Sequence, residues 1–262
     1  MSNHLEQLMA RAAADIREEP AFFRALLKAT IYAHIPLTDR IDAKSVKIRF
    51  IQFHTPDTRK LVLPFFSSEA KARIAAQSTV QVVAMNGRVL FELTRGATLM
   101  LDPNDCRCTL YPEEITALLT TGRVPQIQHF TIQENAEPSV GAPLDSPAWL
   151  IEALSSALSK LPFVNSAYLA GVYSKDAVPQ QQGIVVALVG DPSCAERSVH
   201  AALAVVQPLC EQHSDYSIDM THFDATGPLP EWIVMLGLQP FYDRSWGARL
   251  HDDNQTTVGS VN

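Results

Sequence analysis

The chain has 262 residues, a net charge of −7 and an isoelectric point of about 5.6. This acidic balance, without a cluster of Lys and Arg, argues against nucleic acid and anionic membranes as partners. Hydrophobic residues make up 47% of the chain, and the length suggests two domains, each with its own core.

Two helices are predicted at the start of the chain. Residues 3–19 carry apolar side chains at helical spacing, and Asn3 and Glu6 are spaced as a capping box. Pro20 suits the first turn of a second helix, which buries Phe22, Phe23, Leu26 and Leu27.

Strands follow these helices. Residues 31–35 predict a short strand, and 45–53 alternate in polarity and should pair with 59–66 across a turn. Pro64 lacks an N–H group, so we expect it near a sheet edge or strand end. Ser67 is expected to cap the next helix.

The rest of the first half predicts alternating helices and strands. A helix is expected over 87–95, strands over 97–101 and 106–110 on either side of a turn, and a helix over 112–121 that Gly122 ends. Residues 123–144 are polar, contain three prolines and show no sustained period, which indicates a joint between domains.

The second half repeats this mixture of elements. Helices are predicted over 147–161, 191–212 and 229–237, a hairpin over 165–173 and 183–189, and a further strand over 215–223. A final extended piece is expected over 239–244. The predicted fold class is therefore α+β (α/β-like), with two mixed sheet-and-helix domains in tandem.

Several segments resemble the bacterial enhanced-serine-sensitivity (SseB-type) family. In chain order between residues 22 and 246 they are ALLKATIYAHIP, LVLPFFSSEAKARIAA, MNGRVLFELTRGATLMLDPNDCRCTLYPEEITALL, VGAPLDSPAWLIEALSSALSKLPFVNSAYLAG, GIVVALVG and PFYDR. One departure is Asp102–Asp105, where the family usually has a turn like NPGS. The resemblance implies a two-domain cytoplasmic protein linked to serine sensitivity, and it implies no reaction and no catalytic residues.

The expected domain boundaries combine the pattern and the resemblance. They are an N-terminal helix over 1–19, an N-terminal domain over 20–124, a linker over 125–144, a C-terminal domain over 145–250 and a flexible tail over 251–262. No secretory signal is visible, and the four scattered cysteines do not form a disulfide framework. We expect a cytoplasmic protein with reduced thiols.

Cysteine chemistry has two candidate places. Cys106 and Cys108 would share one face of a strand about 6.6 Å apart, too far for a disulfide, and we favour packing over a metal or redox role. Cys194 is expected at a helix start, where the helix dipole stabilises a thiolate. It is the candidate nucleophile, but Pro192 removes one N–H and Asp191 and Glu196 oppose a thiolate, so we favour a cysteine packed under the sheet.

The densest group of ligand-type residues comprises Cys210, His213, Asp215, Asp219, His222 and Asp224. On a strand, His222 and Asp219 point to opposite faces, so the group cannot converge and no metal site is assigned. No cofactor is expected, because the chain contains neither glycine-rich nucleotide loop and no catalytic motif of the G-x-S-x-G or H-E-x-x-H type.

Aromatic residues near the end of the chain are the candidates for an interaction site. Phe241, Tyr242, Trp232 and Trp246 are residue types that dominate protein interfaces, but aromatics late in a chain also plug a domain end, which we favour. The leading hypothesis is a non-catalytic binding protein that modulates a protein partner, such as a metabolic or sulfur-handling enzyme. The alternatives are a cysteine-dependent transferase that uses Cys194, and an accessory or immunity-type protein of a secretion system.

Overall fold

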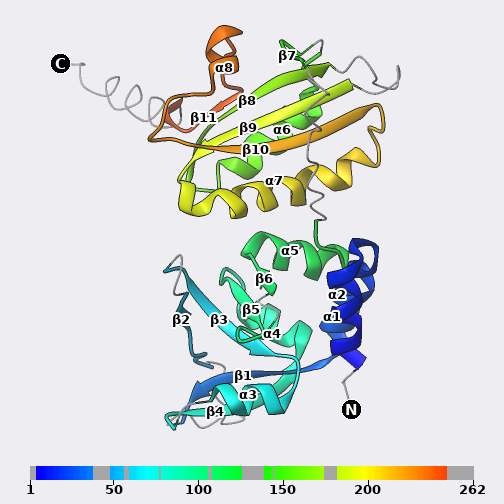
Figure 1. Ribbon diagram of the computed structural model, residues 1–262, viewed down its shortest axis with the longest axis vertical. Coiled ribbons are helices and arrows are strands. Elements are labelled where there is room, and N and C mark those ends of the chain that lie inside the picture. Colours follow the sequence, from blue (N-terminus) through cyan, green and yellow to red (C-terminus); the bar gives the residue numbers. More distant parts are fainter. Residues whose placement is uncertain are drawn as a thin grey trace, which may run out of the picture. The chain divides into compact units, whose positions relative to one another are not determined.

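The computed structural model describes residues 4–37, 48–55, 59–76, 78–105, 108–125, 139–143, 145–173 and 182–246 (Figure 1). The chain divides into two compact units, residues 1–126 and 127–262, called the N-terminal and C-terminal units below. Each unit contains helices and one mixed sheet, so the prediction of two sheet-and-helix domains of the α+β class is confirmed.

The N-terminal unit consists of short helices and a six-stranded sheet. Its elements are α1 (His4–Ala14), η1 (Ile16–Glu18), α2 (Glu19–Lys28), β1 (Thr30–Pro36), β2 (Phe53–His54), β3 (Leu61–Phe66), α3 (Glu69–Ala75), β4 (Val80–Asn86), α4 (Gly87–Leu93), β5 (Leu99–Leu101), β6 (Cys108–Leu110) and α5 (Pro112–Thr121). The strand order is β4-β1-β3-β5-β6, with β2 on β3, and β3 and β5 run parallel.

Pro64 occupies the centre of this sheet, and the expectation of an edge position was wrong. β3 bonds to β5 on one side, where Leu63 donates its N–H to Thr98. On its other side β3 pairs with β2 through Val62 and with β1 through Phe65. Because backbone N–H groups alternate along a strand, the Pro64 nitrogen faces the place where β2 gives way to β1. The missing N–H therefore costs no ladder bond.

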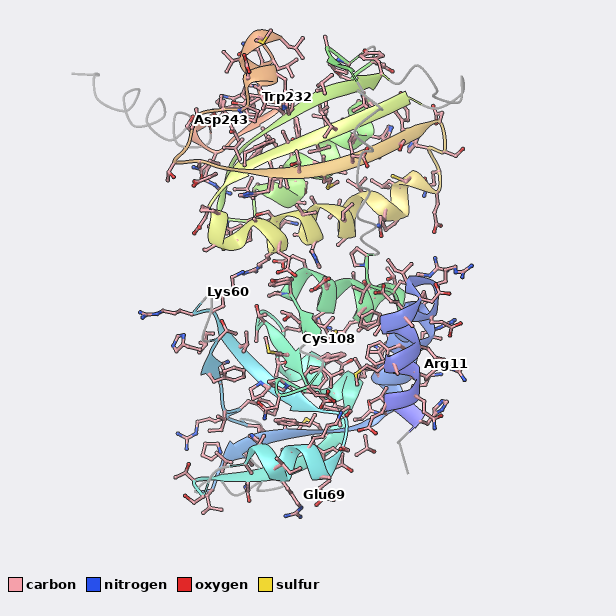
Figure 2. The ribbon with its side chains drawn as sticks, in the orientation of Figure 1. Arg11, Lys60, Glu69, Cys108, Trp232 and Asp243 are labelled. Carbon is pink, nitrogen blue, oxygen red and sulfur yellow. The ribbon has the colours of Figure 1, made fainter. Side chains whose placement is uncertain are left out.

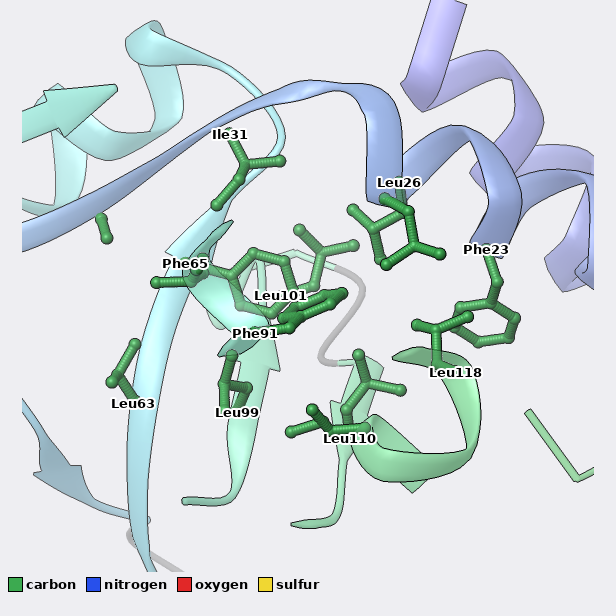
Figure 3. Close-up of a cluster of buried hydrophobic side chains, with 14 of the residues drawn as sticks. Phe23, Leu26, Ile31, Leu63, Phe65, Phe91, Leu99, Leu101, Leu110 and Leu118 are labelled. Carbon is green, nitrogen blue, oxygen red and sulfur yellow. The ribbon is translucent and has the colours of Figure 1, made fainter. Parts of the chain in front are cut away.

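The core of the N-terminal unit lies between the sheet and its helices (Figure 3). Phe65 of β3 meets Phe91 of α4 edge to face, with ring centroids 5.7 Å apart. Leu26 from α2 and Leu118 from α5 are completely buried in the same cluster. Cys108 packs against this core from β6, and Cys106 lies outside the described residues.

A buried polar cluster ties α1, α3 and the β5 turn together. Asp102 accepts hydrogen bonds from the Ser67 N–H at 2.9 Å and the Ser67 hydroxyl at 2.6 Å. The Lys71 ammonium lies 2.7 Å from Asp102, 2.9 Å from Asp105 and 3.3 Å from Glu6. Burial alone lowers the pKa of Lys71, but its hydrogen bonds to these carboxylates outweigh burial and raise the pKa above its usual value.

This cluster corrects the predicted cap of α3. Ser68 caps the helix by accepting the Lys71 N–H, whereas Ser67 is fully buried and bonds Asp102. Asp102 has a φ of 45°, a left-handed conformation that Asp tolerates better than most residues. Since Lys71 already neutralises part of the negative charge, the cluster serves as an internal brace rather than as an open cation site.

The C-terminal unit contains a five-stranded sheet in the order β10-β9-β8-β11, with β7 on β8. Its elements are β7 (Ser139–Gly141), α6 (Ala148–Leu158), β8 (Val164–Tyr173), β9 (Gln182–Gly190), η2 (Pro192–Cys194), α7 (Ala195–Cys210), β10 (Tyr216–Asp224), α8 (Glu231–Met235) and β11 (Tyr242–Asp243). β9 and β10 run parallel, joined by α7, and the other pairs are antiparallel. The segment expected as a linker, 125–144, includes β7.

The two faces of this second sheet differ. Figure 1 shows α6 and α7 along one face, and their apolar sides pack with alternate residues of β8 and β9 such as Leu169 and Val186. A smaller cluster around Ile233 of α8 covers part of the other face, with Tyr168, Ala187 and Val189. Strand side chains alternate between the two faces, so neighbours along β10 belong to different surroundings.

Candidate functional site

The short helix α8 is the most unusual surface feature of the C-terminal unit. Pro230 precedes the helix at its N-cap, and Gly237, with a φ of 59°, ends it in the left-handed conformation. Ile233 is buried against the sheet, and Trp232 packs edge to face on Phe223 with ring centroids 6.3 Å apart. These two contacts hold α8 in place.

The remaining apolar residues of this segment face solvent. Successive helix residues are separated by about 100°, so a single turn that buries Ile233 turns Val234 and Met235 away from the sheet. The exposed fractions are 38% for Leu229, 64% for Val234, 76% for Met235 and 38% for Leu236. We call these four residues the α8 surface. Four large apolar side chains exposed within eight residues form a patch of the kind that marks an interaction site.

Exposed apolar residues of the N-terminal unit are more dispersed. Leu37, Leu61 and Ile74 belong to three different segments, and α4 exposes Val89 and Leu93. Single exposed apolar residues are normal on protein surfaces. Ile74, 83% exposed on α3, therefore provides a control position for experiments on the α8 surface.

Three acidic residues lie on the same side of the C-terminal sheet as the α8 surface. Glu231 is exposed and lies one helical turn from Met235, a spacing of about 5–6 Å between Cβ atoms. Asp243 shares the α8 face of the sheet, because its neighbour Tyr242 packs on the opposite side. Asp219 shares that face with Phe223, four residues along β10. We call Glu231, Asp243 and Asp219 the acidic rim.

Figure 2 shows Trp232 and Asp243 in this part of the C-terminal unit. The whole stretch from Tyr216 to Asp243 contains no Lys or Arg. The two arginines among the described C-terminal residues are engaged elsewhere. Arg197 lies over the Phe163 ring, 4.9 Å from its centroid, and Arg244 binds backbone carbonyls. The residues from Tyr216 to Asp243 therefore supply no Lys or Arg to neutralise the acidic rim.

The predicted interaction residues of the PFYDR segment lie in two different environments. Phe241 and Tyr242 pack against the main core of the C-terminal unit, and the Tyr242 hydroxyl donates to the Leu158 carbonyl at 3.2 Å. Arg244 donates to the carbonyls of Val164 at 2.8 Å and Leu158 at 3.0 Å, and also to Leu161. These contacts favour a packing role at the C-terminal end of α6, where a cation is stabilised by the helix dipole.

The other two predicted residues differ from each other. Trp232 is half-buried beneath the α8 surface and acts as its support. Trp246 is 45% exposed just beyond β11, and its role in an interaction stays a prediction. The structure thus brings Trp232 to the candidate surface and assigns Phe241 and Tyr242 to the interior.

Cys194 lies at the N-cap of α7, after the buried strand β9, as its sequence context suggested. Its backbone carbonyl accepts the Ser198 hydroxyl at 2.8 Å, and its sulfur is 3.7 Å from the Ser193 hydroxyl. The Asp191 carboxylate accepts the Ser193 N–H at 2.8 Å. The Asp191 carboxylate therefore already occupies one backbone N–H donor at this helix start, next to Cys194.

The ligand-type residues around β10 do not converge. Within the described ranges, no group of three or more His, Cys, Asp or Glu side chains is placed to hold a metal ion. The Nε2 atom of His222 is buried without a hydrogen-bond partner, and burial lowers the His222 pKa despite the opposing influence of Asp224 and Asp191. Burial also raises the pKa of the Cys210 thiol, which makes it a poorer ligand and nucleophile.

The α8 surface was not predicted from the sequence for an identifiable reason. Residues 229–237 were expected to form a helix, and an amphipathic helix is expected to bury its apolar residues. The five residues of α8 form too short a helix to bury Leu229, Val234, Met235 and Leu236 together. The absence of Lys and Arg from 216–243 was visible in the sequence and is the signal that marks this region.

These observations define a class: a two-domain α+β protein whose C-terminal domain exposes an apolar segment within an acidic rim. The chain belongs to the SseB family. The family described as "SseB protein N-terminal domain" matches residues 5–117, and "SseB protein C-terminal domain" matches residues 132–244. The resemblance noted in the sequence is confirmed.

Two curated relatives carry the name "Protein SseB", one from Escherichia coli (strain K12) and one from Shigella flexneri. Each is 24% identical to the chain over 257 residues, which cover 98% of this chain and 98% of the relative. The likeness therefore extends over both domains. No solved structure matches the chain significantly. Within the part of the chain that the structure describes, every helix is too short or too polar to cross a membrane.

Proposed function

We propose that the chain is a non-catalytic cytoplasmic protein that binds and modulates a protein partner through the α8 surface. The observation that carries the proposal is the exposure of Val234 and Met235 on α8, and of Leu229 and Leu236 beside its two ends. Ile233 and Trp232 fix this helix to the sheet. A rigidly held apolar patch loses little conformational entropy when it docks, which favours binding.

A role in binding also agrees with what surrounds the predicted nucleophile. The Asp191 carboxylate accepts the Ser193 N–H at the start of α7, so the backbone donor next to Cys194 is already engaged. The relatives' printed name gives a family and no reaction. A metabolic or sulfur-handling enzyme remains the partner class that we propose, with a secretion-system component as the alternative that partner identity would reveal.

The double substitution Val234→Asp with Met235→Asp tests the proposal. Both side chains are largely exposed, so the fold should tolerate the change to within about 1 kcal/mol. We expect partner capture by the immobilised full chain from a native extract to fall at least about tenfold, since apolar contacts at the centre of an interface dominate its energy. Quantitative mass spectrometry of the captured proteins gives the ratio.

The control is Ile74→Asp, which adds one carboxylate, half the charge of the double variant, at a largely exposed apolar position of the N-terminal unit. It should leave capture unchanged. Equal losses in the control and the double variant, or unchanged capture in the double variant, would contradict the proposal. Thermal unfolding of all variants shows whether the fold is intact.

A further inference from the structure

The acidic rim defines which partners fit the α8 surface. Glu231, Asp243 and Asp219 lie on the same face as the exposed apolar residues, and the stretch from Tyr216 to Asp243 offers no cation to pair with them. A partner that buries Met235 must approach Glu231 closely, because one helical turn separates the two. An acidic partner segment would then meet like charge.

We propose that the α8 surface binds a segment of a partner protein in which large apolar side chains are flanked by Lys or Arg. This inference rests on the proposed function, and it adds the chemistry of the partner. The apolar residues would contact Val234 and Met235, while the flanking cations would face the acidic rim. Met235 can adapt its unbranched side chain to different apolar partners, so the anchor is defined by size more than by shape.

Charge complementarity selects this occupant over two others. Anionic lipid surfaces and nucleic acids both present dense negative charge, and the rim repels them. A second copy of the chain would bring its own Glu231 and Asp243 to the same interface if the two α8 surfaces met face to face, and like charges at an interface are unfavourable. A cationic, apolar segment satisfies both features of the surface.

Rim charges act mainly on the rate and salt dependence of association. The Debye length shrinks from about 14 Å at roughly 50 mM salt to about 4 Å at roughly 500 mM salt, so high salt should weaken capture of the cationic segment. Burial of the apolar anchors is not screened. The two contributions can therefore be separated by salt and by substitution.

The experiment is selection from a random-peptide phage library on the full-length protein at low salt. Clones that bind should be enriched in apolar residues with neighbouring Lys or Arg, and they should lose at least about tenfold in binding to the Val234→Asp, Met235→Asp variant. The substitution Glu231→Lys should weaken the same clones about three- to tenfold at low salt and have little effect at high salt.

The matched control is Glu152→Lys, an equal change of charge at an exposed position of α6 on the opposite face of the sheet. It should leave the clones bound. Apolar clones without cation enrichment, which bind Glu231→Lys as well as the original chain, would overturn the charge inference and leave the proposed function standing. Clones that bind the Val234→Asp, Met235→Asp variant normally, or no enrichment over bare support, would overturn both. Sedimentation with phosphatidylglycerol vesicles would overturn the choice of a protein partner.

Discussion

Replacing Arg244 with alanine should lower the free energy of unfolding of the C-terminal unit by about 3 kcal/mol. The guanidinium donates to three backbone carbonyls, those of Leu158, Leu161 and Val164, where α6 ends and β8 begins. Alanine would leave these acceptors without their charged donor in a partly buried place. The loss would affect the junction between α6, β8 and β11, which the Tyr242 hydroxyl also stabilises.

Tryptophan fluorescence during urea unfolding is the measurement for this variant. All three tryptophans, Trp149, Trp232 and Trp246, lie in the C-terminal unit, so the signal reports this unit alone. Arg244→Lys is the matched control, because a lysine has one compact ammonium and lacks the two separate nitrogens through which Arg244 reaches Val164 and Leu158. It should recover only part of the stability. A loss below about 1 kcal/mol for Arg244→Ala would show that the carbonyls find other donors.

Asp102→Ala should cost the N-terminal unit about 3 kcal/mol, since removing one partner of a buried ion pair leaves the other partner uncompensated. Asp102 is almost fully buried, and it bonds Ser67 twice and Lys71 once. Its loss would remove the acceptor of the Ser67 N–H and leave the Ser67 hydroxyl with its longer 3.3 Å hydrogen bond to Glu6. It would also weaken the link through Lys71 to Glu6 on α1.

Peptide-level hydrogen exchange measures this effect unit by unit. Exchange should accelerate in α1, α3 and β5 and stay unchanged in the C-terminal sheet. Asp105→Ala is the control, because the Asp105 side chain is 64% exposed and its ion pair with Lys71 is worth less than about 1 kcal/mol. If the two variants behaved alike, the buried cluster would not be the brace described above.

Local rules predicted most helices of this chain. Pro20 and Pro112 do lie in the first turns of α2 and α5, and Gly122 ends α5 with a φ of 74°. Where two serines stood side by side, the pattern could not decide between them. Ser68 became the cap because Asp102, thirty-five residues from Ser67 in sequence, engages Ser67. A contact of that range has no local signature.

The strands were less predictable. β4 was not predicted, since Val80–Asn86 show no clean alternation of polar and apolar residues. β2 is only two residues long, and it shares only Phe53 with the expected strand 45–53. The central position of Pro64 follows from two strands sharing one edge of β3. Strand order depends on contacts between distant segments, which a single sequence does not specify.

Only part of the candidate site could be predicted from the sequence. The aromatic and arginine residues of PFYDR drew attention to the end of the chain, and the structure turns Phe241, Tyr242 and Arg244 inward. The exposure of the residues next to Trp232 was not predicted, because a helix is expected to bury its apolar side. That expectation fails for a helix of a single turn. Exposure is a property of the packed fold, so it could be found only there.

Photo-crosslinking from position 235 tests directly whether the α8 surface contacts a protein partner. A chain with Met235 replaced by p-benzoylphenylalanine is irradiated in native extract, alongside a chain with the same replacement at Ile74. We expect a covalent adduct with a defined protein from position 235 and none from position 74. The adduct should be joined through a partner segment rich in apolar residues and Lys or Arg. Identical adducts from both positions, or none from position 235 while the chain still captures a partner, would contradict it.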